Sequence, residues 1–468
     1  MTRRFASALL LISALCFLAG PRIAHAGGPA SPAVELSMTD CVRLGVAANL
    51  SLMQKALERD EKRFGIEIAR RVYIPTATLQ ADESRDAQRV RTLLQGVSST
   101  GVLGTKLEIE NEIRDVPAGG RNAQTQAFSL TQPLMKNFGR AVTGYEIDVA
   151  RIEYEAGVEK FRADLDAFIF DVMSLCLDLS VAGRNLVIQE QACARARQQF
   201  EDTRHDIELG AIAEREIYLV EENLVAFEIR RDTTRQEIAQ LELELRRLLN
   251  IDPAVEDRIT VRNVLSEEDT LPPASFAGAL EIARQESPAL RLERLLLNKS
   301  VSALERQRIQ YQPRLDLLFD YRLREGGTGA DNAYTVGVEY GIPLDRGGDR
   351  AALEQARLAT AIRKVAGRDA DSRLAYTIRE ILLRIDYLTR IIAAKHRATE
   401  LSQKKLDAET EKYRNGYSTL ADLVRFQREL EEAQIDEIES QVSLRKSRLR
   451  LLLAQGTLHR QFGISVGN

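Results

Sequence analysis

Apolar residues recur at alternating spacings of four and three along two long segments of the chain. They are Phe168, Val172, Leu175, Leu179 and Ala182 in the first segment, and Leu374, Ile378, Ile381, Ile385 and Leu388 in the second. An offset of 206 residues relates the two sets, so the chain contains a duplication. This spacing predicts helices that pack lengthwise against a neighbour. A repeat of this kind buries its apolar edge only against another copy, in the same chain or in a partner.

A glycine ends each of these helical patterns at the same offset. Gly210 follows the pattern from Arg140 to Glu208, and Gly416 follows the pattern from Arg350 to Arg414. At 1.5 Å per residue each helix spans roughly 100 Å, which is far longer than the helices of compact domains. Further helical patterns follow both glycines, over residues 213–250 and 418–455. Each glycine therefore predicts the tight turn of a helical hairpin.

Each repeat opens with a shorter helical pattern that meets a proline. The two patterns cover residues 37–72 and 275–311, and Pro75 and Pro313 follow them. Proline cannot donate a backbone hydrogen bond and disfavours helix at the residue before it, so both helices are expected to end there.

The period changes from 3.6 to 2 after Pro313. The pattern predicts a β-hairpin of about ten residues per strand, with one apolar and one polar face, around the turn Gly326–Gly329. Strands of this length suit an outer-membrane β-barrel, and the alternative is a hairpin half-buried on a soluble core. The candidate lipid-facing residues are Leu315, Leu317, Phe319, Tyr321, Val336, Val338 and Tyr340.

The first repeat carries corresponding strands with a less regular alternation. We expect them over residues 76–86 and 123–134, separated by an insertion at 87–122. The insertion contains an alternating piece from Thr105 to Arg114, and it forms either an added hairpin or an external loop.

The N-terminus carries the pattern of a secretory signal peptide over residues 1–26. Arg3 and Arg4 precede an apolar run that is too short for a membrane helix, and Ala24-His25-Ala26 has the small-x-small pattern of a cleavage site. Loss of this segment removes three arginines and no acid, which changes the formal net charge from −4 to −7. A negative charge argues against nucleic acid as a partner.

The sequence offers little to a cofactor or a catalytic site. No P-loop, GxSxG, HExxH or clustered Cys/His motif is present, so we expect neither an enzyme nor a metal or cofactor site. Cys176 and Cys193 are 17 residues apart on one predicted helix, about 25 Å, which is too far for a disulfide. The sequence does not determine the redox state of Cys41, Cys176 or Cys193.

With these features, the chain resembles the TolC family of outer-membrane efflux ducts. The resemblance covers essentially the whole mature sequence and rests on the elbows Pro133–Gly139 and Pro343–Gly348, and on the tip motif Tyr413-x-x-Gly416-x-Ser418-x-x-x-Asp422-Leu423. It implies a mainly α protein with a β-barrel: long coiled-coil helices form a periplasmic tunnel, and four or so strands per chain join a trimeric 12-stranded barrel.

The resemblance also implies function, location and partners. The protein would be the outer-membrane exit duct of a tripartite efflux pump or type I secretion system, reaching into the periplasm and working as a homotrimer with a periplasmic adaptor and an inner-membrane transporter. Its exported substrate stays open. The alternatives are a periplasmic adaptor or a structural coiled-coil protein without a channel.

Two sets of site residues come with the resemblance. Asp422 lies on an acidic gate position of the family, whereas the second acidic position is Arg425 here; Glu216 is the first-repeat counterpart of Asp422. A plain helix-start role for Asp422 is the alternative. The candidate adaptor-docking tips are Leu209, Gly210, Gly416, Tyr417 and Ser418, which equally suit ordinary helical turns.

The predicted organisation has five parts. They are the signal peptide (1–26), the first repeat (27–250), an equatorial linker (251–271), the second repeat (272–456) and a C-terminal tail (457–468).

Overall fold

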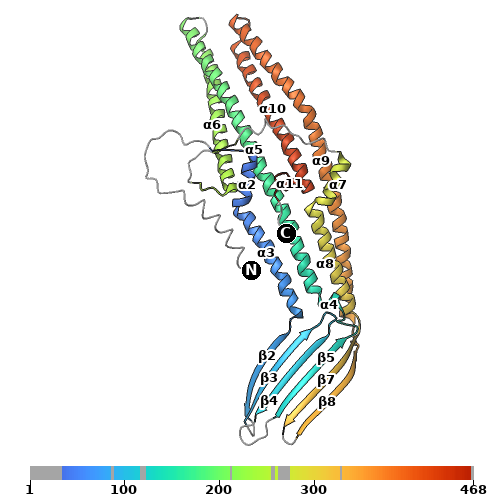
Figure 1. The fold of residues 1–468 in the computed structure, drawn as a ribbon. Helices are drawn as coiled ribbons and strands as arrows, with labels where there is room; N and C mark the ends of the chain where they lie inside the picture. Colours follow the sequence, from blue (N-terminus) through green and yellow to red (C-terminus); the bar gives the residue numbers. More distant parts are fainter. Residues whose placement is uncertain are drawn as a thin grey trace, which may run out of the picture.

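The computed structural model is an elongated molecule with two helical hairpins at one end and a β-sheet at the other (Figure 1). The residues it describes are 34–85, 89–115, 123–210, 213–253, 259–261, 275–326 and 329–464. The predicted signal peptide lies outside these residues, as does most of the predicted equatorial linker.

Helices make up most of the described chain. They are α2 (Met38–Ala48), α3 (Leu50–Arg70), the 3₁₀ turn η1 (Arg71–Tyr73), α4 (Arg140–Thr143), α5 (Tyr145–Glu208), α6 (Glu216–Leu249), α7 (Phe276–Glu286), α8 (Pro288–Gln310), α9 (Gly347–Arg414), α10 (Leu420–Gln455) and α11 (Leu458–Gln461). The strands are β1 (Val34–Leu36), β2 (Thr76–Arg85), β3 (Arg89–Thr100), β4 (Lys106–Asp115), β5 (Ala123–Pro133), β6 (Ile259–Val261), β7 (Arg314–Gly326) and β8 (Gly329–Gly341).

The two predicted hairpins are present. Helices α5 and α9 contain 64 and 68 residues, and α6 and α10 return beside them. The opening helix of each repeat is broken once, at Asn49 between α2 and α3 and at Ser287 between α7 and α8. Asn49 caps α3 by accepting from the N–H of Leu52, and Pro288 starts α8 at a position that needs no N–H donor.

Shorter helices stack end to end beside each long one. Asn49 donates its Nδ2 to the carbonyl of Leu248 across 3.0 Å, which joins the start of α3 to the end of α6. Both α3 and α6 pack on α5, and α8 and α10 pack on α9 in the same way. Each repeat is therefore two helical rows wide along most of its length.

The heptad positions form the buried seams of these rows. Val172, Leu175 and Leu179 are buried on α5, and Ile378, Ile381 and Leu388 are buried on α9. The largest apolar core gathers residues of α2, α5, α6 and α10, and it includes Leu458 of the C-terminal tail. Burial at both sets of positions agrees with the duplication inferred from their spacing.

A cluster of charged side chains joins the two repeats beside this core. The carboxylate of Glu286 accepts from Arg162 of α5 at 3.0 Å, Arg291 of α8 at 2.9 Å and Arg460 of α11 at 2.7 Å. Although burial opposes its ionisation, the hydrogen bonds from Arg162 and Arg460 lower the pKa of Glu286. Arg162 also donates to the carbonyl of Gly456, so one carboxylate organises four elements.

The C-terminal tail and the linker both reach this central region. His459 of α11 donates its backbone N–H to Asp166 of α5, and its Nδ1 lies 2.8 Å from the same carboxylate. In the linker, β6 pairs in parallel with β1. The tail is thus fixed to the long helix of the first repeat.

The sheet has six strands, where four or so were expected. Its order is β2-β3-β4-β5-β7-β8, with every pair antiparallel. The difference arises from the insertion at 87–122, whose described residues form the hairpin β3–β4 rather than an external loop.

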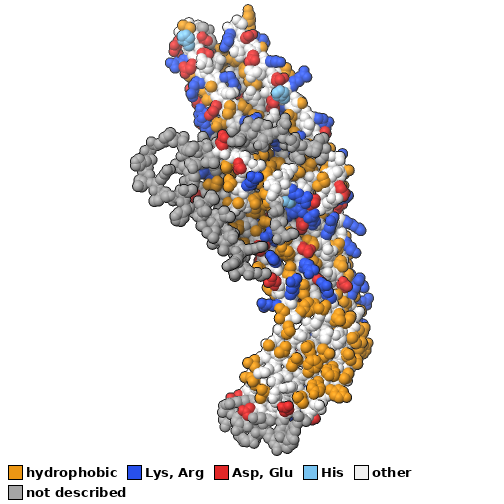
Figure 2. All heavy atoms as spheres, viewed as in Figure 1, with side chains coloured by type: hydrophobic (Ala, Val, Ile, Leu, Met, Phe, Trp, Pro, Cys, Tyr) orange, Lys and Arg blue, Asp and Glu red, His pale blue; other side chains and the backbone are white. Residues whose placement is uncertain are grey.

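The apolar face expected from the alternation is present. Leu317 pairs with Val338, Phe319 with Val336, and Leu315 with Tyr340, so these side chains share one face with Tyr321. Figure 2 shows hydrophobic side chains gathered over the sheet, whereas charged side chains are spread along the helices. Among the described residues, no helix is both long and apolar enough to span a membrane.

Two of the buried cysteines lie together. Cys41 of α2 and Cys176 of α5 are both in the largest core, and a hydrogen bond from the Cys176 thiol lowers the pKa of Cys41. Their separation in sequence gave no sign of this contact, which arises from the packing of α2 on α5.

Candidate gate and docking tips

The tip of the first hairpin ends in an open left-handed turn. Helix α5 ends at Glu208, Leu209 follows as its C-cap, and Gly210 has φ +73°. A Cβ placed on Gly210 would meet nothing within 4 Å, so glycine is required there by conformation rather than by space. The Leu209 side chain is 68% exposed, which leaves an apolar residue at the apex.

The second tip repeats this geometry. Gly416 has φ +76°, and the N–H of Tyr417 reaches back to the carbonyl of Lys412 at 2.8 Å, which closes the end of α9. Tyr417 is 84% exposed. The hydroxyl of Ser418 donates to Glu409, and this hydrogen bond, aided by Lys412, lowers the pKa of the Glu409 carboxyl. Ser418 is therefore committed to the turn, whereas Leu209 and Tyr417 are free to contact a partner.

The candidate gate residues Asp422 and Arg425 lie close together near the start of α10. The Asp422 carboxylate accepts from Thr419 Oγ1 at 2.6 Å and from Arg425 Nη2 at 3.0 Å. The backbone N–H of Asp422 donates to Thr419 Oγ1 in return, so Asp422 completes the N-terminal cap of the helix. The helix-start role is thus present, with a charge pair added to it.

Glu216 occupies the matching position at the first residue of α6. Its carboxylate lies 3.5 Å from Nε of Arg215, and it is close enough to Tyr413 of α9 to contribute to raising the pKa of that phenol. Burial is the largest cause of that increase, followed by the negative charge of Asp206. Glu216 and Asp206 belong to the first hairpin, so Tyr413 of the second hairpin lies against the first.

Tyr413 is a residue of interest that sequence reasoning did not select as a site. Its hydroxyl lies near the side chain of Thr203, which is fully buried on α5. Tyr413 also packs with Leu406, Leu423 and Leu430 of its own hairpin. It had appeared only as the first residue of the tip motif, and no local pattern indicates a partner two hundred residues away.

A polar seam continues the contact between the hairpins below the tips. Glu431 of α10 is buried, and its carboxylate accepts from Gln189 of α5 and from Arg230 of α6 at 2.8 Å. One turn nearer the tip, Arg428 donates to Asn223 of α6 at 3.1 Å. The two hairpins are therefore joined over this stretch by directional polar contacts.

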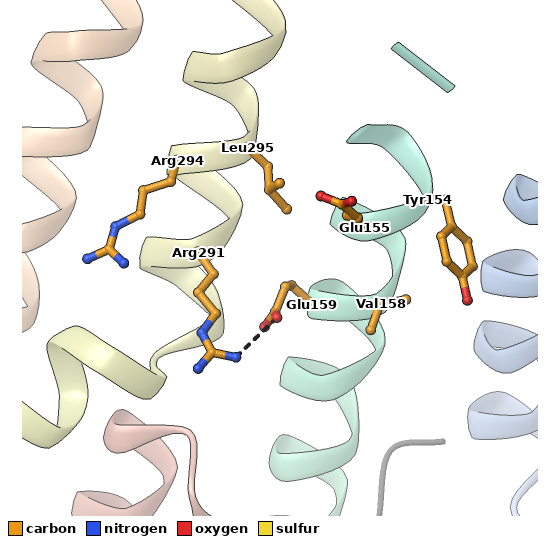
Figure 3. A pocket seen from close by; sticks show the side chains of 7 residues that line it. All are labelled: Tyr154, Glu155, Val158, Glu159, Arg291, Arg294 and Leu295. Carbon is orange, nitrogen blue, oxygen red and sulfur yellow. Dashed lines mark hydrogen bonds and ion pairs between the residues drawn. The ribbon is translucent and has the colours of Figure 1, made fainter. Parts of the chain in front are cut away.

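A groove of about 500 Å³ lies nearer the sheet, between α5 and α8 (Figure 3). Arg291 reaches across it to Glu159 at 3.3 Å, while Tyr154 and Val158 present apolar surface. It is a seam between rows of helices. Across the described part of the chain, no group of three or more His, Cys, Asp or Glu could hold a metal.

Comparison with known proteins identifies the architecture. Residues 279–457, most of the second repeat, match the model of the family described as outer membrane efflux protein. Over this repeat, the chain is similar to the outer membrane efflux protein family. The resemblance to the TolC family is confirmed, and the protein is an efflux channel of the outer membrane that extends into the periplasm, not an enzyme.

Solved structures extend the fold similarity to the whole chain. A membrane protein from Pseudomonas aeruginosa matches with 16% identity and a TM-score of 0.71, over 95% of this chain and 99% of that one. The CmeC outer membrane channel of Campylobacter jejuni matches with 14% identity and a TM-score of 0.68, over 94% of each chain. The open-state MtrE outer membrane channel of Neisseria gonorrhoeae matches with 16% identity and a TM-score of 0.66, over 94% of this chain and 97% of that one. The comparison with curated protein sequences gives no match.

For an outer membrane efflux protein, the two ends of the molecule have different tasks. The six-stranded sheet with its apolar face suits the membrane, and the hairpin tips lie at the opposite end of the molecule (Figure 1). A periplasmic adaptor or a channel-free coiled coil does not account for this pairing of two hairpins with a long-stranded sheet.

Proposed function

We propose that this outer membrane efflux protein is the exit duct of a tripartite efflux pump or type I secretion system. It works as a homotrimer, receives substrate from an inner-membrane transporter, and docks a periplasmic adaptor at its tips. The observation that carries the proposal is the pair of long hairpins whose tips lie at the end opposite the sheet, with Leu209 and Tyr417 exposed there.

The gate of this duct lies just inside the tips. Tyr413 and Thr203 hold the second hairpin against the first, and the polar seam around Glu431 continues that contact. The opening at the tips is the mouth of the duct. The trimer places three Asp422–Arg425 ion pairs around this mouth. Opening requires the second hairpin to move away from the first, so these polar contacts are the ones that must break.

The charge at the mouth influences which ions pass. Each Asp422 carboxylate is partly neutralised by Arg425 at 3.0 Å, so the ring of three pairs has a weaker negative potential than a ring of unpaired acids. We therefore expect only a modest cation preference in the closed duct.

The experiment that tests the duct has two arms. Purified protein is placed in planar lipid bilayers to measure conductance, and its oligomeric state in detergent is measured by native mass spectrometry. Stable single-channel steps from a trimer are expected. A protein that inserts without conductance, or that stays monomeric, contradicts the duct.

Docking is tested separately in cells with a photo-crosslinking amino acid at position 417. The expected product contains a periplasmic adaptor, identified by mass spectrometry. The same substitution at Tyr376, an exposed tyrosine far along α9 from the tip, is the matched control. Equal adaptor capture at both positions would show that the tip is not the docking site.

A further inference from the structure

The added hairpin β3–β4 is a full part of the sheet. It pairs with β2 along ten residues on one side and with β5 along nine on the other. In consequence β2 is separated from β5 by two strands, and among the described strands of this sheet only β2 and β8 keep an unpaired edge.

The inner turn of this hairpin is fixed to the strand-to-helix elbow. The carbonyl of Leu103 accepts from the N–H of Gly139 at 3.1 Å, and that of Val102 accepts from Thr143 Oγ1 at 2.7 Å. Gly104 packs so closely that a Cβ on it would lie 2.5 Å from the carbonyl oxygen of Asn137. The turn therefore sits at the level where the other strands meet the helices, and the hairpin spans the same height as they do.

Both faces of the hairpin continue the faces of the remaining strands. The register places one apolar row on a single face of the sheet. Across the six strands it consists of Ala77, Val97, Ile109, Phe128, Tyr321 and Tyr334. On the other face, Glu110 lies between Gly96 and Ala127. A continuous apolar row across β3 and β4 is expected if these strands face lipid, and it is not expected of a hairpin that lies in water.

The unpaired edges of β2 and β8 have the direction and length needed to pair with each other between two copies of the chain. Strand β2 leaves the helices and β8 returns to them, so β2 of one copy is antiparallel to β8 of the next (Figure 1). They contain 10 and 13 residues. In a lipid environment their unpaired N–H and C=O groups require partners, which a second copy of this chain supplies.

We propose that the membrane wall of this duct contains six strands from each copy, joined through β2–β8 contacts, so that the trimer closes an 18-stranded rather than a 12-stranded barrel. This inference rests on the trimer of the proposed function. Barrel diameter grows roughly linearly with strand number, so the outer pore is about one and a half times as wide as 12 strands allow.

The first test asks whether β4 lies in the wall. Nitroxide spin labels are placed by Ile109→Cys and Glu110→Cys, neighbours on opposite faces of β4, in protein reconstituted in lipid. Collision rates with oxygen and with a water-soluble nickel chelate are measured for each. The described native cysteines Cys41, Cys176 and Cys193 are buried, so unsubstituted protein provides the labelling background.

We expect the label at 109 to meet oxygen and the label at 110 to meet the nickel chelate. Equal nickel access at both positions would place the hairpin outside the membrane and overturn the 18-stranded barrel. Native mass spectrometry of the same samples counts the copies. A trimer with a water-exposed hairpin leaves the duct intact, whereas a different copy number contradicts the proposed function itself.

The second test examines the edges with cysteine pairs oxidised in the membrane. Leu79→Cys on β2 is combined in turn with Val336→Cys, Val338→Cys and Tyr340→Cys on β8, all on the apolar face. At least one pair is expected to link neighbouring copies, and the single variants none. Leu79→Cys with Phe128→Cys on β5 is expected to stay unlinked, because two strands lie between. A disulfide between Leu79→Cys and Phe128→Cys would overturn the proposal. So would the absence of a disulfide in all three pairs that combine β2 with β8.

Discussion

The carboxylate of Asp422 lies 3.0 Å from the guanidinium of Arg425, one turn further along α10. If the Asp422–Arg425 pair helps to hold the mouth closed, Asp422→Ala is expected to raise single-channel conductance. The variant is also expected to lower cation preference, because the mouth loses three negative charges. Thr419→Ala is the control, since it removes the cap partner at a cost of about 1 kcal/mol and keeps the charge. If both variants change conductance equally, Asp422 acts only as a helix cap.

Tyr413→Phe tests the contact between the two hairpins. The variant loses the hydroxyl that lies near the buried Thr203. If this polar contact is worth about 1 kcal/mol, its loss shifts the closed–open balance roughly fivefold toward open. Open probability in planar bilayers is the measurement. Tyr376→Phe, on an exposed tyrosine of the same helix, is expected to leave it unchanged. An unchanged Tyr413→Phe channel would remove this tyrosine from the gate.

The faces of the sheet are tested on adjacent residues of β8. Val336→Arg, on the apolar face near the middle of the strand, is expected to cost about 2 to 4 kcal/mol, whereas Thr335→Arg on the other face costs little. Trimer yield and thermal stability are compared. Equal losses would show that the faces are assigned incorrectly.

Glu286 is expected to be important for stability. Glu286→Gln leaves Arg162, Arg291 and Arg460 without their shared counter-charge, at a cost of about 3 kcal/mol. Folding lowers the pKa of Glu286. Its contribution to the free energy of unfolding is therefore fully present above the pKa of the unfolded chain, about 4.3, and is lost as the pH falls through the lower pKa of the folded protein. Thermal melting followed by circular dichroism measures it. Glu281→Gln, exposed on the same helix, is the control. A neutral Glu286→Gln would show that the cluster only fills space.

His396 gives the α9–α10 hairpin a weak pH dependence. A hydrogen bond to Glu437 at 2.8 Å, with the charge of Glu400, raises the pKa of His396. The imidazolium therefore stabilises the hairpin fully below about pH 6.5, and this stabilisation is lost as pH rises through the higher folded value. An NMR titration midpoint above 6.5 that falls in Glu437→Gln is expected. A midpoint at or below 6.5 in the unsubstituted protein contradicts this contact.

Much of the helical architecture was predictable because its signals are local. Heptad spacing around Val172 and Ile378 depends only on residues three and four apart, and the turns at Gly210 and Gly416 depend on one backbone conformation each. The alternation after Pro313 likewise identified strands β7 and β8 and their apolar face. Duplication strengthened each signal, since every feature had a counterpart at a fixed offset.

The number of strands needed the tertiary structure. Strand β3 alternates weakly in sequence, and it becomes part of the sheet through pairing on both sides and through a turn fixed to Gly139. The breaks at Asn49 and Ser287 were also not expected, because a single capping residue inside a strong helical pattern gives little signal.

The contacts between distant residues lie beyond what the sequence by itself determines. Periodicity showed that α5 and α9 have buried seams, yet it could not bring Tyr413 to Thr203, Cys41 to Cys176, or three arginines to Glu286. Each of these pairs depends on the rotation and axial position of one helix relative to another. Those are set by the packing of the whole helical array, to which residues hundreds of positions apart contribute together.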